Sequence, residues 1–250
     1  GQIIKALRDT DQLDNTLLIF LSDNGGCAEG GPPRPAKTAE EDNLLIRTQY
    51  TRDGVPVYIG NDPSIMPGPE STYQTYGPPW ANLSNTPFRE YKHWVHEGGI
   101  ATPLIVHWPE KLQNRGGMIH QPCQLPDIMA TFLDVSGTKY PTEYRGEQIH
   151  PLEGKSFAPL LHGGSMEKEY LIWEHEGNKA IRQGKWKLVS KYSQDWELYD
   201  MENDRTEMHN CADQYPEFVN KLGNLFWQWA ERCYVKPWEE IIERREQNKG

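Results

Sequence analysis

The stretch Thr16-Leu17-Leu18-Ile19-Phe20-Leu21-Ser22-Asp23-Asn24-Gly25-Gly26 decides the fold, because an apolar run ends directly in oxygen-bearing side chains. Residues 17–21 are continuously apolar, which is typical of a strand covered by helices on both faces of a parallel sheet. Ligands of open α/β sheets bind at the carboxyl ends of such strands. Asp23 and Asn24 are therefore candidate ligands of Ca²⁺ or Mg²⁺, which prefer hard oxygen donors. The alternative is a simple turn, since Asn-Gly and Gly-Gly pairs are common turn formers.

The composition is that of a globular protein. The chain has 250 residues, of which 36% are hydrophobic and 25% charged, enough for one core with a smaller subdomain. Its formal net charge of −10 argues against nucleic acid as the main partner, because a phosphate backbone needs a basic surface. No apolar stretch approaches the roughly 18 residues of a membrane span.

The four cysteines give no metal or redox motif. They stand far apart without a C-x-x-C pair, so free thiols and one or two disulfides both remain open. These are Cys27, Cys123, Cys211 and Cys233.

The rest of the chain predicts a larger α/β part, residues 1–164, and a small part, residues 165–250. In the first part we expect a short helix, the strand described above, a long irregular loop rich in Pro and Gly, a second strand and a helix that ends at a glycine. In the second part short strands separated by Gly-containing turns predict a small antiparallel sheet, which an amphipathic helix from Pro216 would cover. The expected segments are residues 3–7, 17–21, 27–85, 104–108 and 126–137, then strands at 170–174, 179–182, 186–190 and 196–199.

A cluster of charged and imidazole side chains precedes the second strand. Lys92, His93, His96 and Glu97 fall within residues 92–99. A lysine near a metal at the carboxyl edge of the sheet would hold an anionic oxygen as a compact point charge. Taken singly, Lys92 is more typical of a solvated surface lysine, and the two histidines are more typical of structural histidines than of catalysts.

Four segments together resemble the C-terminal half of a sulfatase of the bacterial arylsulfatase type, in the family's order and across most of the chain. Each alone is weakly specific. The segments are Thr16-Leu17-Leu18-Ile19-Phe20-Leu21-Ser22-Asp23-Asn24-Gly25, Lys92-His93-Trp94-Val95-His96-Glu97-Gly98-Gly99-Ile100, Leu152-Glu153-Gly154-Lys155-Ser156 and Trp196-Glu197-Leu198-Tyr199-Asp200.

The resemblance implies the fold of the alkaline phosphatase superfamily: an α/β domain with a mixed sheet sandwiched by helices, followed by a small C-terminal antiparallel sheet packed by a helix. It implies that Asp23 and Asn24 bind Ca²⁺ and that Lys92 holds the sulfate group. The nucleophile of such enzymes is a formylglycine, made from Cys or Ser in a Cys/Ser-x-Pro-x-Arg motif. His96 and His175 are weaker candidates that would line the substrate pocket. The substrate would be an aryl or carbohydrate sulfate ester, and the enzyme would be exported to the periplasm or beyond.

The sequence departs from the family pattern in one large respect. None of its cysteines or serines begins a Cys/Ser-x-Pro-x-Arg motif, and the early Asp-Asp pair is missing. Two oxygen donors are too few for calcium, which takes six to eight. We therefore expect a fragment of a longer sulfatase that is inactive alone. A phosphodiesterase or phosphonate hydrolase relative, and a non-catalytic remnant that binds sulfated glycans, are the alternatives.

Overall fold

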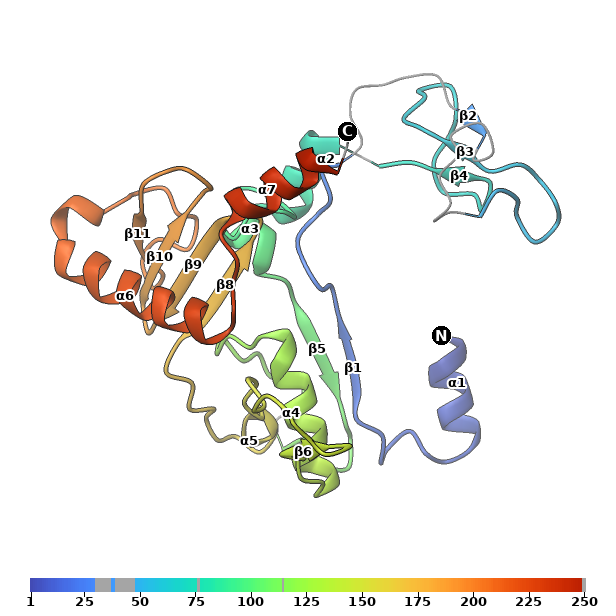
Figure 1. Ribbon diagram of the computed structural model, residues 1–250. Helices are drawn as coiled ribbons and strands as arrows, with labels where there is room; N and C mark the ends of the chain where they lie inside the picture. The colour runs from blue at the N-terminus through green and yellow to red at the C-terminus, as the bar shows by residue number, and fades with distance from the viewer. Residues whose placement is uncertain (30–36, 39–47, 76, 114, 249–250) are drawn as a thin grey trace. The chain divides into compact units, whose positions relative to one another are not determined.

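The computed structural model describes residues 1–29, 37–38, 48–75, 77–113 and 115–248 (Figure 1). The chain forms two compact units, each built from two separate segments. Residues 1–23 and 103–171 form the first unit, and residues 24–102 and 172–250 form the second. From the sequence we instead expected two continuous parts, residues 1–164 and 165–250. That division stays a prediction.

The first unit is built on an antiparallel strand pair. Strand β1 (Leu18–Leu21) pairs with β5 (Leu104–His107), with Ile19 opposite Val106. Both strands were predicted, but the parallel neighbour that we expected for β1 is not found among the described residues. Ile19 packs on the core beneath, whereas Phe20 is 73% exposed, because successive side chains of a strand point to opposite faces.

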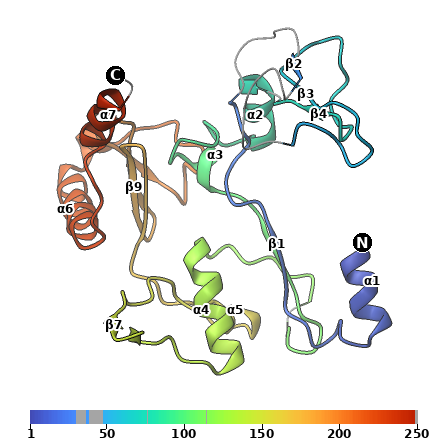
Figure 2. The same cartoon turned by 45° about the vertical axis from the view of Figure 1, so that its right-hand side comes forward.

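Two helices cover the inner face of this pair, and Figure 2 shows them beside each other. Helix α4 (Leu125–Ser136) and the short α5 (Ala158–Leu161) supply apolar side chains to one core cluster. The buried members of this cluster are Phe157, Leu160, Leu161 and Met166, and the partly buried ones include Leu17, Ile19, Val106 and Ile128. Helix α1 (Gln2–Asp9) precedes β1 as predicted and has no buried residue.

Helix α4 has clear start and stop signals, of which the sequence prediction used the glycine at the end. Gln124 and Asp127 form a capping box, in which the Gln124 side chain and the Asp127 carboxylate each accept a backbone N–H of the first turn. The helix ends at Gly137, whose φ of 67° is a left-handed conformation that glycine adopts without strain. The predicted helix is therefore confirmed.

The C-terminal sheet of the second unit has the strand order β11-β10-β9-β8. Strand β10 pairs antiparallel with both β9 and β11, and helix α6 (Pro216–Arg232) packs on β9 and β10 (Figure 1). The predicted sheet and its covering helix are both confirmed. The strands are β8 (Leu171–His175), β9 (Asn178–Gln183), β10 (Trp186–Ser190) and β11 (Glu197–Asp200).

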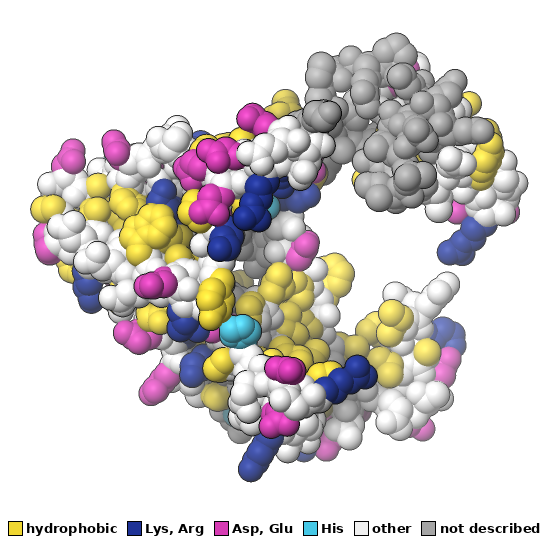
Figure 3. All heavy atoms as spheres, in the orientation of Figure 1, with side chains coloured by type: hydrophobic (Ala, Val, Ile, Leu, Met, Phe, Trp, Pro, Cys, Tyr) yellow, Lys and Arg dark blue, Asp and Glu magenta, His cyan; other side chains and the backbone are white. Residues whose placement is uncertain are grey.

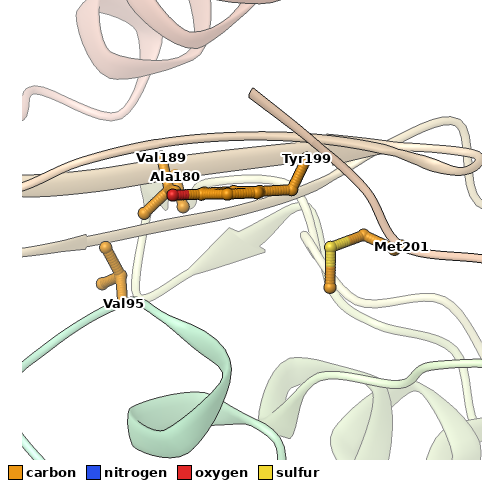
Figure 4. Packing of buried hydrophobic residues seen from close by; sticks show 5 residues of the cluster. All are labelled: Val95, Ala180, Val189, Tyr199 and Met201. Carbon is orange, nitrogen blue, oxygen red and sulfur yellow. The ribbon is translucent and has the colours of Figure 1, made fainter. Parts of the chain in front are cut away.

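Strand β10 is buried on both faces, which its sequence does not reveal. On one face, the buried side chain of Leu188 packs against helix α6 beside Gly223. On the other face, Val189 joins a cluster of buried apolar side chains contributed by the sheet, by the residue that follows β11 and by the segment before β5 (Figure 4). The other members of this cluster are Val95, Ala180, Tyr199 and Met201. Residues 89–100, which end in the short helix α3 (Glu97–Ile100), therefore cover the second face of the sheet.

Several elements had no counterpart in the sequence prediction. The long loop contains a small sheet and a helix, although its residues 30–36, 39–47 and 76 lie outside the described residues. A short hairpin follows α4, and a helix ends the chain. These elements are β2 (Lys37–Thr38), β3 (Tyr58–Ile59), β4 (Thr72–Tyr73), α2 (Gly77–Asn85), β6 (Glu143–Tyr144), β7 (Glu147–Gln148), the 3₁₀ turn η1 (Ala212–Gln214) and α7 (Trp238–Gln247).

The four cysteines, all of which lie in the part of the chain that the structure describes, form no disulfide, which decides between the two possibilities left open by the sequence. Burial raises the pKa of the Cys123 thiol to about 11, so this thiol is poorly reactive. None of the helices within the described ranges is long and apolar enough to cross a membrane.

Candidate functional site

The loop that follows β1 is fixed by hydrogen bonds to the segment before β5. Gly25 N–H donates to the carbonyl of Gly99 at 2.9 Å, and Gly26 N–H donates to Asn85 Oδ1 at 2.9 Å. In return, the backbone N–H of Lys92 donates to the carbonyl of Gly26 at 3.0 Å. The backbone of Lys92 is therefore held directly against the loop that carries Asn24.

Close backbone packing explains the glycines at this contact. A Cβ on Gly25 would lie 1.8 Å from the carbonyl oxygen of Gly98. A Cβ on Gly99 would lie 1.9 Å from the carbonyl oxygen of Trp94. Real atoms do not approach this closely, so both positions require glycine for close approach, and Gly25 does more than form a turn.

The predicted calcium ligands end the first unit and open the second. Asp23 is exposed and Asn24 is half-buried. A carboxylate and an amide carbonyl fit calcium in kind, because both are hard oxygen donors. They do not fill a coordination shell of six to eight oxygens, so the remaining donors would have to come from elsewhere.

Lys92 presents a charged side chain that is only loosely held. Its side chain is 39% exposed, and Nζ lies 3.5 Å from Oε2 of Glu29, which is itself 67% exposed. Exposed ion pairs of this kind are worth at most about 1 kcal/mol. The Lys92 ammonium can therefore leave Glu29 and pair with an incoming anion at little cost in free energy.

His96 lies in a different environment from the one we expected. It is fully buried, and Nε2 lies 3.1 Å from Oε2 of Glu197, which also accepts the Tyr199 hydroxyl at 2.9 Å. The hydrogen bond to His96 is the main cause that holds the Glu197 pKa below its ordinary value, although burial opposes it. In this arrangement His96 anchors residues 89–100 to the sheet, and its role in a substrate pocket stays a prediction.

His175 lies in a group of three potential metal ligands. It ends β8, is exposed, and its ring centroid lies 5.2 Å from that of His93. Glu176 follows directly, with Oε2 lying 3.5 Å from His93 Nδ1. Sequence reasoning selected His175 but did not group it with Glu176 and His93, because the approach of His93 depends on packing between residues 82 and 83 positions apart.

An open pocket of about 210 Å³ lies beside this group. Aromatic faces and polar side chains line it together, which is the mixture found in sites for sugars and other small ligands. The lining residues besides His93 and Glu176 are Trp94, Asn178, Lys191, Tyr192, Gln194 and Trp238.

A buried ion cluster connects strand β10 to helix α3, and no local sequence pattern predicted it. Lys187 of β10 is fully buried, with Nζ 2.9 Å from Oε1 of Glu97 and 2.8 Å from Oε1 of Glu207. Burial, the largest single cause, raises the pKa of Glu97, but the charge and hydrogen bond of Lys187 together with the charges of Arg182 and Arg205 outweigh it and hold the pKa below its ordinary value. Glu97 is therefore a structural carboxylate, kept ionised by its buried partner.

Comparison with known proteins identifies the family. A family model described as "Sulfatase" matches residues 1–138, and one described as "N-sulphoglucosamine sulphohydrolase, C-terminal" matches residues 89–231. An "Uncharacterized sulfatase" of Schizosaccharomyces pombe is 29% identical over 231 residues, which are 89% of this chain and 39% of that protein. The N-acetylgalactosamine-6-O-sulfatase of Bacteroides thetaiotaomicron is 24% identical over 242 residues, covering 90% of this chain and 38% of that enzyme.

A solved structure shows the same fold. The crystal structure of Ps i-CgsB in complex with k-i-k-neocarrahexaose superposes with a TM-score of 0.62 at 22% identity, covering 92% of this chain and 40% of that one. The chain thus spans about two fifths of the length of these proteins. The predicted fold class, an alkaline-phosphatase-like α/β architecture with a small C-terminal antiparallel sheet, is confirmed. Since each family model matches more than half of its residues, the chain belongs to the sulfatase family.

Proposed function

We propose that this chain is part of an enzyme that hydrolyses sulfate esters, with carbohydrate sulfates as the substrate class. One observation carries the proposal: the loop of Asn24 and the backbone of Lys92 are hydrogen-bonded to each other through Gly26. The substrate class is supported by the relative named N-acetylgalactosamine-6-O-sulfatase. Aromatic residues in the pocket beside His93 suit a sugar ring and also an aryl group, so an aryl sulfate is the alternative substrate.

Lys92 would hold the sulfate group. Cleavage of a sulfate ester builds negative charge on the sulfuryl oxygens and on the leaving oxygen, and a fixed ammonium stabilises that charge in the transition state. Its loose ion pair with Glu29 means that the substrate anion replaces an exposed carboxylate. The leaving alcohol also requires a proton, and Lys92 or a neighbouring histidine would donate it.

Asp23 and Asn24 would contribute two oxygen ligands to a Ca²⁺ ion. The ion, when bound, supplies positive charge that polarises the sulfate. The remaining ligands and the formylglycine nucleophile would come from residues outside this sequence, because no Cys/Ser-x-Pro-x-Arg motif occurs in it. By the same family likeness, the enzyme would work in the periplasm or outside the cell.

The test is a matched pair of lysine substitutions in the full-length protein, assayed with an aryl sulfate and a 6-O-sulfated amino sugar. Lys92→Ala removes the proposed sulfate clamp and should lower kcat by at least ~100-fold, the usual effect of losing one transition-state donor. Lys111→Ala removes a similar surface lysine, 47% exposed and 3.6 Å from Glu110, and should leave kcat unchanged. Equal activity of Lys92→Ala and wild type would overturn the assignment. A full-length wild type that binds sulfated sugar without turnover would support the non-catalytic alternative.

A further inference from the structure

We propose that His93, His175 and Glu176 form a binding site for a divalent transition-metal ion, with Zn²⁺ as the best chemical fit. This site uses none of the residues proposed to bind calcium. Each of its three side chains offers one ligand atom, and these atoms all lie within 4.8 Å of one another. The inference stands on this geometry and does not depend on the proposed sulfatase activity.

The two histidines approach each other edge to face. Their ring centroids are 5.2 Å apart with an interplanar angle of 82°, which leaves room for an ion between ring nitrogens. His93 Nδ1 already lies 3.5 Å from Glu176 Oε2. Zinc bonds of about 2.0–2.2 Å require ligand atoms a little over 3 Å apart. Only a small rotation is needed, and the side chains of His93 and Glu176 are one-third exposed and can make it.

A rigid hairpin turn holds two of the three ligands. Glu176 and Gly177, with φ values of 51° and 81°, link β8 to β9, and Glu174 Oε1 accepts the Gly177 N–H at 2.8 Å. The buried Asn178 fixes the same turn, since its Nδ2 donates to the carbonyl of His175 at 2.8 Å. The ligands therefore come from a turn whose backbone is already ordered, which lowers the entropic cost of binding.

Nearby cations do not occupy the position of the ion. Arg245 lies 3.5 Å from Oε1 of Glu176, whereas His93 faces the other oxygen, Oε2. Lys191 lines the adjacent pocket, but its ammonium pairs with Glu90 and lies 4.4 Å above the ring of Trp94. Oε2 of Glu176, the oxygen that faces His93, is thus the one available to a metal.

The donor set selects the metal. Imidazole nitrogens suit zinc, copper and nickel, whereas calcium and magnesium prefer oxygen donors alone. Two histidines and one glutamate are a known zinc ligand set, which leaves a fourth position for water or an anionic ligand. The open pocket next to His93 and Glu176 provides access to that position.

Isothermal titration of the metal-free protein with ZnCl₂ tests the site. The wild type should bind one ion, and His175→Ala and Glu176→Gln should each weaken binding at least tenfold. His209→Ala is the matched control, because His209 is also next to a carboxylate, 3.7 Å from Asp204, and is 88% exposed. This variant should bind zinc like the wild type. Circular dichroism checks that all variants fold.

Absence of saturable zinc binding, or equal affinity of all three variants, would overturn the site. Titration with Co²⁺ gives a second readout, since tetrahedral coordination by His93, His175 and Glu176 should produce a visible absorption band that Glu176→Gln abolishes. Lys92→Ala should retain full zinc affinity. Loss of sulfatase turnover with intact zinc binding therefore separates failure of one proposal from failure of the other.

Discussion

At the scale of single residues, Lys187 is the cation that holds together the buried ion cluster on the C-terminal sheet. Its ammonium is fully buried between the carboxylates of Glu97 and Glu207. An unpaired buried ion costs several kcal/mol, so each member of this cluster needs the others. The backbone N–H of Glu97 also donates to Glu207 Oε2 at 2.8 Å, which ties helix α3 to the same cluster.

Lys187→Ala should lower the free energy of unfolding by about 3–5 kcal/mol, because it removes the ion partner of the buried Glu207 carboxylate and leaves Glu97 with only the half-exposed Arg205, 3.5 Å away, as an ion-pair partner. Lys185→Ala is the matched control in the neighbouring turn. It removes an ion pair at 2.7 Å to Asp200, but the Lys185 side chain is 40% exposed, so we expect little change. Urea unfolding measures both. A similar loss for the two variants would show that burial of Lys187 does not matter.

At the scale of secondary structure, local patterns predicted the elements that are bounded by turn signals or that carry an apolar stripe. Strands β8 to β11 and helix α6 were found because Gly-containing turns and apolar periodicity are local signals. Helix α7 was missed because only Trp238, Ile241 and Ile242 of its ten residues are apolar, too few for a recognisable apolar stripe. The antiparallel pairing of β1 with β5 could not be predicted, because the direction of pairing depends on the path of the chain between them.

The residues of the candidate site also differ in whether a local sequence pattern could predict them. Asp23, Asn24 and Lys92 stand in contiguous motifs, so sequence reasoning could select them. The buried environment of His96 depends on Glu197, 101 positions away, which no local pattern reveals.

Helix α4 offers an element-scale prediction, since its first turn is organised by one buried carboxylate. Asp127 accepts the N–H groups of Gln124 and Lys155 at 2.7 and 2.8 Å, and pairs with Lys168 Nζ at 2.8 Å. Asp127→Ala should lower the free energy of unfolding by about 3 kcal/mol or more, because it leaves these groups without a partner.

The control for that prediction is Asp134→Ala in the same helix. Asp134 is exposed and accepts one hydrogen bond from Ser156, so the loss should stay below about 1 kcal/mol. Thermal unfolding followed by circular dichroism compares the two variants. Equal midpoints would contradict the role of the buried carboxylate.

At the scale of the whole molecule, the outer face of the β1–β5 pair is an apolar surface. Phe20 is 73% exposed and Ile105 is 59% exposed, and Figure 3 shows hydrophobic side chains gathered over these strands. In the sulfatase fold such strands belong to a larger mixed sheet covered on both faces. That explains why residues 17–21 are apolar throughout, although the described chain covers only one face.

We therefore expect the 250-residue chain to associate with itself through this face, because exposed strands with apolar side chains attract one another. Phe20→Ser should weaken association about tenfold, since it removes roughly 1.5 kcal/mol or more of apolar burial at the contact. Stability should hardly change, because this side chain is mostly exposed. Met118→Ser is the control: Met118 is 80% exposed in a loop of the same unit, and its loss should leave association unchanged. Light scattering over a concentration series measures the effect, and equal behaviour of the two variants would show that the contact lies elsewhere.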